Sequence, residues 1–137
     1  MIRNHLLLIV ICASLISCQT KTQSHYYNEP HRPQFHFTPE SNWMNDPNGL
    51  VYLNGQYHLF YQHYPNDIVW GPMHWGHTSS TDLFHWKHHP IALYPDSLGN
   101  IFSGSAVIDH NNTAGFGKDA MVAIFTYHKM IQSGQKV

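Results

Sequence analysis

The stretch of sequence that decides the fold reads Leu50-Val51-Tyr52-Leu53-Asn54-Gly55-Gln56-Tyr57-His58-Leu59-Phe60-Tyr61-Gln62. Two short runs rich in aromatic and aliphatic residues flank the pair Asn54-Gly55. This pair accepts the positive φ angles that a tight two-residue turn requires. The stretch therefore predicts an antiparallel β-hairpin.

Further runs of the same kind follow the hairpin, at 74–80, 86–93, 103–109 and 120–127. No segment has the length and the 3.6-residue period of a helix, so the sequence predicts an all-β fold. The hairpin starts at Gly49 and Gly104 lie about 55 residues apart, which is near the period of a propeller blade. Two hairpins at this spacing do not establish a repeat by themselves.

The composition favours a sugar as the partner. Charged residues make up 11% of the chain, compared with about 25% in an average domain. Aromatic residues make up 14%, and the net charge is −1. The absence of a basic stripe argues against nucleic acid as a partner. Aromatic, Asn, Gln and His side chains together suit a surface that stacks on sugar rings and binds their hydroxyl groups.

The N-terminus predicts export. Leu6–Ile16 is an uncharged apolar run, shorter than the ~20 residues of a membrane-spanning helix, and it follows a weakly positive start. This pattern is typical of a secretory signal. Leu15-Ile16-Ser17-Cys18 resembles a bacterial lipobox, which predicts a lipid on Cys18 that anchors the protein to a membrane of the cell envelope. The alternative is cleavage near Ser17 and secretion without a lipid.

Three segments are expected along the chain. Residues 1–18 form the signal peptide with its lipobox, 19–34 a polar tether with two prolines, and 35–137 the N-terminal part of a catalytic domain. Removal of Cys12 with the signal leaves no pair of cysteines for a disulfide bond.

The chemistry is concentrated in the stretch Ser41-Asn42-Trp43-Met44-Asn45-Asp46-Pro47-Asn48-Gly49. Pro47 biases the residue before it to an extended conformation, which predicts that Asp46 is held on a stiff turn. Asn45 and Asn48 can hydrogen-bond a ligand or the backbone. On turn composition alone, an Asx-turn leading into a strand is the favoured interpretation.

The run Trp43–Gly49 resembles the N-terminal signature of glycoside hydrolase family 32, which comprises invertases, inulinases and levanases. The resemblance continues in order through Tyr61-Gln62, Trp70-Gly71, Trp75-Gly76-His77, Ser80–Trp86, Pro90–Leu93 and Phe102–Ser105. It covers roughly residues 36–128.

This resemblance implies that the chain holds the first one to two blades of a five-bladed β-propeller. It implies a retaining glycosidase that cleaves β-fructosyl bonds in sucrose or fructans, with no metal and no cofactor. Asp46 matches the nucleophile. The positions that match the fructosyl pocket are Asn45, Gln62, Trp70, Phe102 and Ser103, and each of these could instead be an ordinary strand or core residue.

The 13 histidines raise the question of a metal site. His74 and His77 could meet at one metal ion on a helix, but their segment is predicted to be a strand. Zinc sites need a few ligands that converge, commonly with a cysteine or a carboxylate. We therefore expect no metal, and we expect Asp82 to stabilise a turn between strands.

Retaining hydrolysis needs two carboxyl groups about 5–5.5 Å apart. The family takes its acid from a Glu followed by Cys and a stabilising Asp from an Arg-Asp-Pro motif. In this sequence Glu29 precedes Pro30, Glu40 precedes Ser41, and neither motif is present. The sequence is therefore expected to be the nucleophile-bearing fragment of a hydrolase. The alternative is a surface carbohydrate-binding fragment without catalysis.

Overall fold

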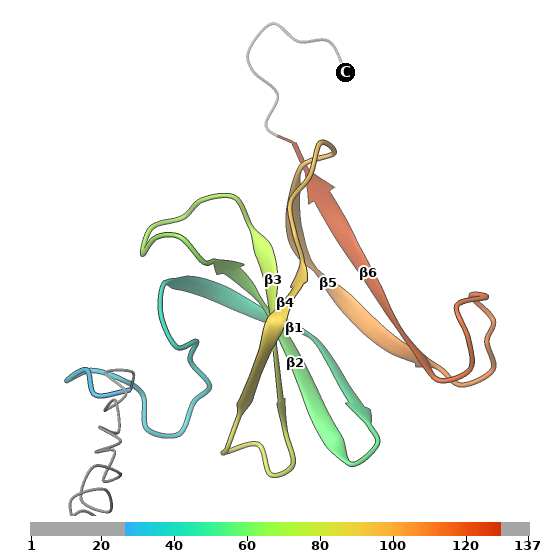
Figure 1. The fold of residues 1–137 in the computed structure, drawn as a ribbon, viewed down its shortest axis with the longest axis horizontal. Helices are drawn as coiled ribbons and strands as arrows, with labels where there is room; N and C mark the ends of the chain where they lie inside the picture. The colour runs from blue at the N-terminus through green and yellow to red at the C-terminus, as the bar shows by residue number, and fades with distance from the viewer. Residues whose placement is uncertain (1–26, 130–137) are drawn as a thin grey trace, which may run out of the picture.

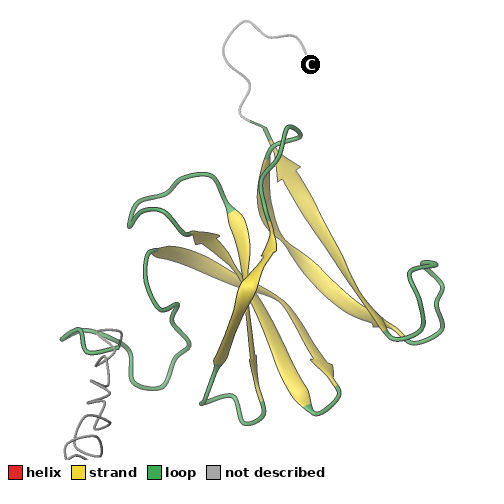
Figure 2. Cartoon of the chain, in the orientation of Figure 1, coloured by secondary structure: helices red, strands yellow, loops and turns green. Residues whose placement is uncertain are grey.

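The computed structural model describes residues 27–129, which form two antiparallel β-sheets (Figures 1 and 2). The strands are β1 (Trp43–Leu53), β2 (Gln56–Tyr64), β3 (His74–Ser80), β4 (Lys87–Leu93), β5 (Asn100–Asp109) and β6 (Ala120–His128). Every expected run is a strand, so the all-β prediction is confirmed. No helix within residues 27–129 is long and apolar enough to cross a membrane. The expected signal and Cys18 lie outside the described residues.

The first sheet is a meander in the order β1-β2-β3-β4, and each strand is antiparallel to the next. Asn54 and Gly55 have φ angles of 50° and 81°, as the predicted tight turn between β1 and β2 requires. The second sheet pairs β5 with β6. Figure 1 shows β5 passing beside β1, which brings together two edges that are far apart in the sequence.

A small core joins the two sheets. Phe60 and Trp75 of the first sheet pack with Ile101 and Ala106 of the second, and Trp75 is completely buried. The indole Nε1 of Trp75 donates a hydrogen bond of 3.1 Å to the carbonyl oxygen of Phe102. Apolar burial and this hydrogen bond together fix the position of β5 against the first sheet.

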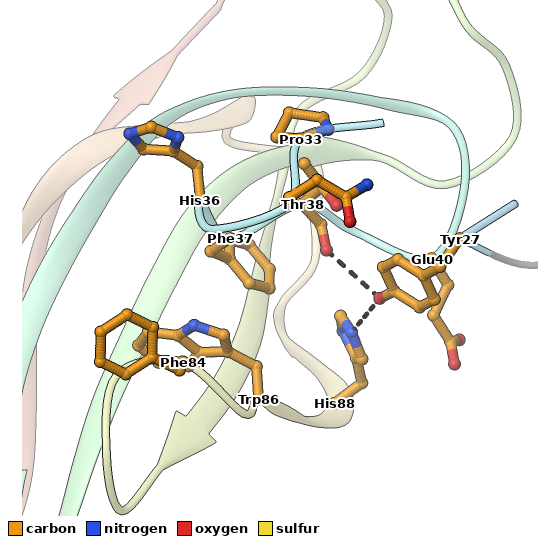
Figure 3. Close-up of a pocket in the computed structure, with 10 residues that line it drawn as sticks. Tyr27, Pro33, His36, Phe37, Thr38, Glu40, Phe84, Trp86 and His88 are labelled. Atoms are coloured by element: carbon orange, nitrogen blue, oxygen red, sulfur yellow. Dashed lines mark hydrogen bonds between the residues drawn. The ribbon is translucent and has the colours of Figure 1, made fainter. Parts of the chain in front are cut away.

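The other face of the first sheet carries residues 27–42, on the side away from β5 and β6 (Figure 1). The ring of Phe37 lies 4.9 Å from that of Tyr61, centroid to centroid. Burial raises the pKa of Tyr61 to about 12. Arg32 pairs with Glu29 and donates a 2.9 Å hydrogen bond to Thr38 Oγ1. Tyr27 Oη, in the expected tether, lies 2.5 Å from His88 Nε2 of β4, so the tether contacts the sheet there (Figure 3). The domain boundary at residue 35 stays a prediction.

Candidate active site

Asp46 lies in a bulge of β1. The neighbouring residues pair normally across to β2, Asn45 with Gln62 and Pro47 with Tyr61, but Asp46 has no partner on β2. Its φ angle is 38°, in the left-handed region. The expectation of an extended residue on a turn before the strand was therefore wrong. The extra residue of a bulge is turned out of the ladder, which aims its side chain in a new direction, and the carboxylate is exposed.

Two residues after the bulge fix its shape. Asn48 is 7% exposed, and its Nδ2 donates a 2.9 Å hydrogen bond to the carbonyl oxygen of Asp46. Gly49 has a φ angle of 58°, and a Cβ atom there would lie 2.9 Å from Phe60 Cδ2 and 3.3 Å from Trp75 Cζ3. Gly49 is required both by its conformation and by the close approach of these two rings.

β5 supplies the direct partner of Asp46. Ser103 Oγ donates a 3.1 Å hydrogen bond to Asp46 Oδ2, although the two residues are 57 positions apart. This contact joins the two sheets at the carboxylate and restricts the rotation of its side chain. The structure thus brings together the predicted nucleophile and one predicted pocket residue.

Gln62 lies beneath this site on β2, opposite Asn45. Its side chain is 4% exposed, and its Nε2 has no hydrogen-bond partner within the described part of the chain. The same is true of Asn48 Oδ1. A buried polar atom without a partner costs about 1–3 kcal/mol, so these two amide groups near Asp46 keep a hydrogen-bonding capacity that no described residue uses.

The two predicted aromatic residues have different surroundings. The ring of Phe102 stacks on His128 at 4.3 Å between centroids, next to Ser103. Trp70 is 48% exposed in the loop between β2 and β3. Trp43 N donates a 2.9 Å hydrogen bond to the carbonyl oxygen of Asp67, which ties this loop to the start of β1. Among the described residues, no ring contact or hydrogen bond links Trp70 to Asp46.

Trp75 is a site-supporting residue that the sequence reasoning did not single out. It contacts the position of Gly49 on β1 and holds the backbone of Phe102 on β5, so it supports both strands that form the site. Six of the seven residues of β3 are buried, so alternation could not mark Trp75, and the signal available was a tryptophan within a predicted strand.

Two other described carboxylates, Asp82 and Asp109, have structural partners. Asp82 accepts hydrogen bonds from the backbone N–H groups of Phe84 and His85, which lowers its pKa and stabilises the turn between β3 and β4. Asp109 accepts from the backbone N–H of Thr113 and Ala114 in the β5–β6 loop. Between residues 27 and 129, no group of three or more His, Cys, Asp or Glu side chains is arranged to hold a metal ion.

Comparisons with known proteins agree with this geometry. The model of the glycosyl hydrolases family 32 N-terminal domain matches residues 36–137. The chain is 65% identical over 106 residues to a levanase of Bacillus subtilis (strain 168), covering 75% of this chain and 16% of the levanase. It is 52% identical over 123 residues to an extracellular exo-inulinase of Aspergillus niger, covering 81% of this chain and 23% of that protein.

The chain also matches a solved structure. The crystal structure of an exo-inulinase from Aspergillus awamori matches with a TM-score of 0.66 and 54% sequence identity, covering 71% of this chain and 20% of the inulinase. The chain therefore spans less than a quarter of the length of each of these three relatives.

Proposed function

The chain belongs to glycosyl hydrolase family 32, whose N-terminal domain is a five-bladed β-propeller, and we propose from this that it carries the nucleophile of a retaining β-fructosidase. The sheet β1–β4 is then one blade, and β5–β6 belong to the next. The proposed substrates are sucrose or fructans such as levan and inulin. We call the longer polypeptide that would carry residues 19–137 the parent enzyme.

In the proposed mechanism Asp46 attacks the anomeric carbon of the fructosyl unit and forms a covalent ester. The bond to the leaving oxygen breaks, and a second carboxyl group about 5–5.5 Å away protonates that oxygen. Water, deprotonated by the same group, then attacks the anomeric carbon, releases fructose and restores Asp46. The sequence motifs of that second carboxyl group are not present in these 137 residues.

The remaining predicted residues would hold the fructosyl unit. Gln62 Nε2 is free to donate to a sugar hydroxyl. We assign Asn45 and Ser103 to hydrogen bonds beside the anomeric carbon, and Trp70 and Phe102 to the apolar walls of the pocket. These roles follow the family pattern at matching positions and are open to test residue by residue.

The observation that carries the proposal is the hydrogen bond between Ser103 and Asp46. It fixes the exposed carboxylate of Asp46 on a bulge, where the two proposed blades meet. The buried Nε2 of Gln62, which has no hydrogen-bond partner among the described residues, lies on the neighbouring strand. A carbohydrate-binding fragment without catalysis is not favoured, because the relatives are named as hydrolases.

The direct test uses the purified parent enzyme with sucrose, levan and inulin. We expect release of fructose, with the β-anomer formed first, because two inversions at the anomeric carbon retain its configuration. NMR spectroscopy within the first minutes of the reaction distinguishes the anomers. Initial formation of α-fructose, or no release from any of the three substrates, would rule the mechanism out.

We propose that the protein is exported and anchored by a lipid on Cys18. The word extracellular in the name of the Aspergillus niger relative supports export, and the Leu15–Cys18 lipobox supports the lipid. In a bacterial host, the wild-type protein is expected to take up radioactive palmitate and to sediment with membranes. Cys18→Ser should abolish the labelling. A soluble, unlabelled wild-type protein would leave only an ordinary secretory signal.

A further inference from the structure

The loop between β2 and β3 lies at the end of the first sheet that carries Asp46. It begins after Tyr64, the last residue of β2, which pairs with Trp43 at the start of β1. The loop carries Trp70, the proposed apolar wall of the fructosyl pocket. The position of this ring relative to Asp46 therefore depends on how the loop is held against β1.

Two consecutive residues at the start of β1 hold the loop. Asn42 Nδ2 donates a 2.5 Å hydrogen bond to the carbonyl oxygen of Pro65. Trp43 N donates a 2.9 Å hydrogen bond to the carbonyl oxygen of Asp67. The second bond comes from the backbone, so many residues could make it at this position. The first depends on the side chain of Asn42.

The backbone at Asn42 also restricts which residue can stand there. Its φ angle is 68°, in the left-handed region, which asparagine adopts more readily than most residues other than glycine. Glycine would adopt this conformation equally well but has no amide to donate. The position thus combines two requirements, a left-handed backbone and a side-chain donor.

The loop is held on the other side of Trp70 as well. Gly71 is buried, and a Cβ atom there would lie 2.4 Å from Cε1 of the Tyr64 ring. Trp70 is three residues from Asp67, a span of at most about 11 Å of extended chain. A change in the hold on residues 65–67 is therefore transmitted to the ring over a short distance, because Gly71 fixes the chain just beyond it.

We propose that Asn42 is a positioning residue for the hydrolysis reaction. Its hydrogen bond to Pro65 sets the loop so that Trp70 forms its wall of the pocket before the substrate arrives, which lowers the cost of ordering the site. Asn42 acts through the loop rather than through contact with the sugar. The inference rests on the proposed function for the role of Trp70.

The test uses Asn42→Gly in the parent enzyme, which removes the amide and keeps the left-handed conformation without strain. We expect kcat/KM for sucrose to fall about threefold to tenfold, the size expected for one lost hydrogen bond. Asn112→Gly is the matched control. Asn112 also has a positive φ, 56°, and its Oδ1 accepts a 2.7 Å hydrogen bond from Gly117 N. Its loop begins after Asp109, about 20 Å along β5 from Ser103, so this variant should keep the parent kcat/KM.

A double-mutant cycle with Trp70→Ala separates positioning from a general effect on the fold. In the Trp70→Ala background, Asn42→Gly should change kcat/KM less than about twofold, because the ring that Asn42 positions is gone. An equal loss in both backgrounds would overturn the inference, since Asn42 would then act on something other than Trp70. An unchanged kcat/KM in the single Asn42→Gly variant would overturn it too.

Hydrogen exchange measured by mass spectrometry tests the hold on the loop without any turnover. Peptides covering residues 65–71 should exchange faster in Asn42→Gly than in the parent enzyme, while peptides covering 110–119 should be unchanged. Unchanged exchange in 65–71 would overturn the inference about Asn42. A parent enzyme that releases no fructose would instead end the hydrolase proposal, and the exchange rates would still show whether Asn42 holds the loop.

Discussion

Asp46 owes its position to three features, each with a different physical role. The bulge between Asn45 and Pro47 turns its side chain out of the ladder. Asn48 holds its carbonyl oxygen, and Ser103 holds one carboxylate oxygen. A nucleophile positioned in this way loses little conformational freedom when it attacks, because its orientation is set before the substrate arrives.

Ser103→Ala tests this positioning. A hydrogen bond to a charged group is worth about 1.5–3 kcal/mol, so the variant is expected to lower kcat for sucrose by about tenfold to a hundredfold. Its melting temperature should change little, because Ser103 is only half-buried. Ser105→Ala, an exposed serine on the same strand, is the control and should retain the parent kcat. A Ser103→Ala enzyme with normal kcat would show that the contact does not matter for turnover.

The sequence indicated which residues matter at this scale but not how they meet. Asp46 stood out because of the run around it, whereas its positive φ arises from the register between β1 and β2. Local propensity favours an extended residue before Pro47, and the bulge overrides that preference. The contact with Ser103 depends on how two sheets pack, which no local pattern contains.

At the scale of elements, Trp75 is the link between the blades. Trp75→Phe removes the hydrogen bond to Phe102 O and leaves a small void in a fully buried position. We expect a loss of about 2–4 kcal/mol in the free energy of unfolding, measured by denaturant titration. Trp70→Phe, at a residue 48% exposed, should leave that free energy within about 0.5 kcal/mol of the parent value. Equal stability of the two variants would contradict the role of Trp75.

A row of histidines crosses β2, β3 and β4 on the face that turns toward β5 and β6. His58 Nδ1 lies 3.0 Å from His77 Nε2, and the ring of His77 stacks on that of His89 at 4.5 Å between centroids. Burial, together with the charges that His89 and His58 would carry, lowers the pKa of His77 to about 4. Ser79 Oγ lies 2.8 Å from His89 Nε2. Burial lowers the pKa of His89, and the positive charge of Lys87 lowers it further.

This row predicts loss of stability in acid. His77 takes up a proton near pH 6.5 in the unfolded chain but only near pH 4 in the folded one. Between these values the unfolded state binds more protons, so stability falls as the pH falls from 6.5 to 4. Melting temperatures measured across this range should drop less steeply in His77→Gln than in the parent enzyme. His31→Gln, an exposed control, should keep the parent slope. Identical slopes in all three proteins would refute this origin.

The strands themselves were predictable because short runs rich in aromatic and aliphatic residues lie between turn residues, and Asn54-Gly55 set the first register. The exception is the start of β1, which lies at Trp43 rather than at Leu50. Pro47 and the asparagines around it are typical of turns, so the composition predicted a turn where the structure has a strand bent by a bulge.

At the scale of the whole molecule, the propeller came from the resemblance and not from periodicity. Two sheets contain too little repetition to count blades. The match to the exo-inulinase structure at a TM-score of 0.66 confirms that these sheets are blades of a five-bladed propeller. In a propeller the first strands of successive blades line a common centre, and this arrangement is the reason that β1 and β5 meet at Asp46.

The turnover of the Asp46→Asn variant decides whether Asp46 is the nucleophile. The amide has nearly the same shape but cannot form the fructosyl ester, so the variant of the parent enzyme should fold normally and bind substrate. Asp119→Asn, a partly exposed carboxylate that pairs with His110, is the matched control and should keep the parent kcat. We expect Asp46→Asn to lower kcat for sucrose by at least about a thousandfold. A variant that keeps more than about a hundredth of the parent kcat would contradict this expectation.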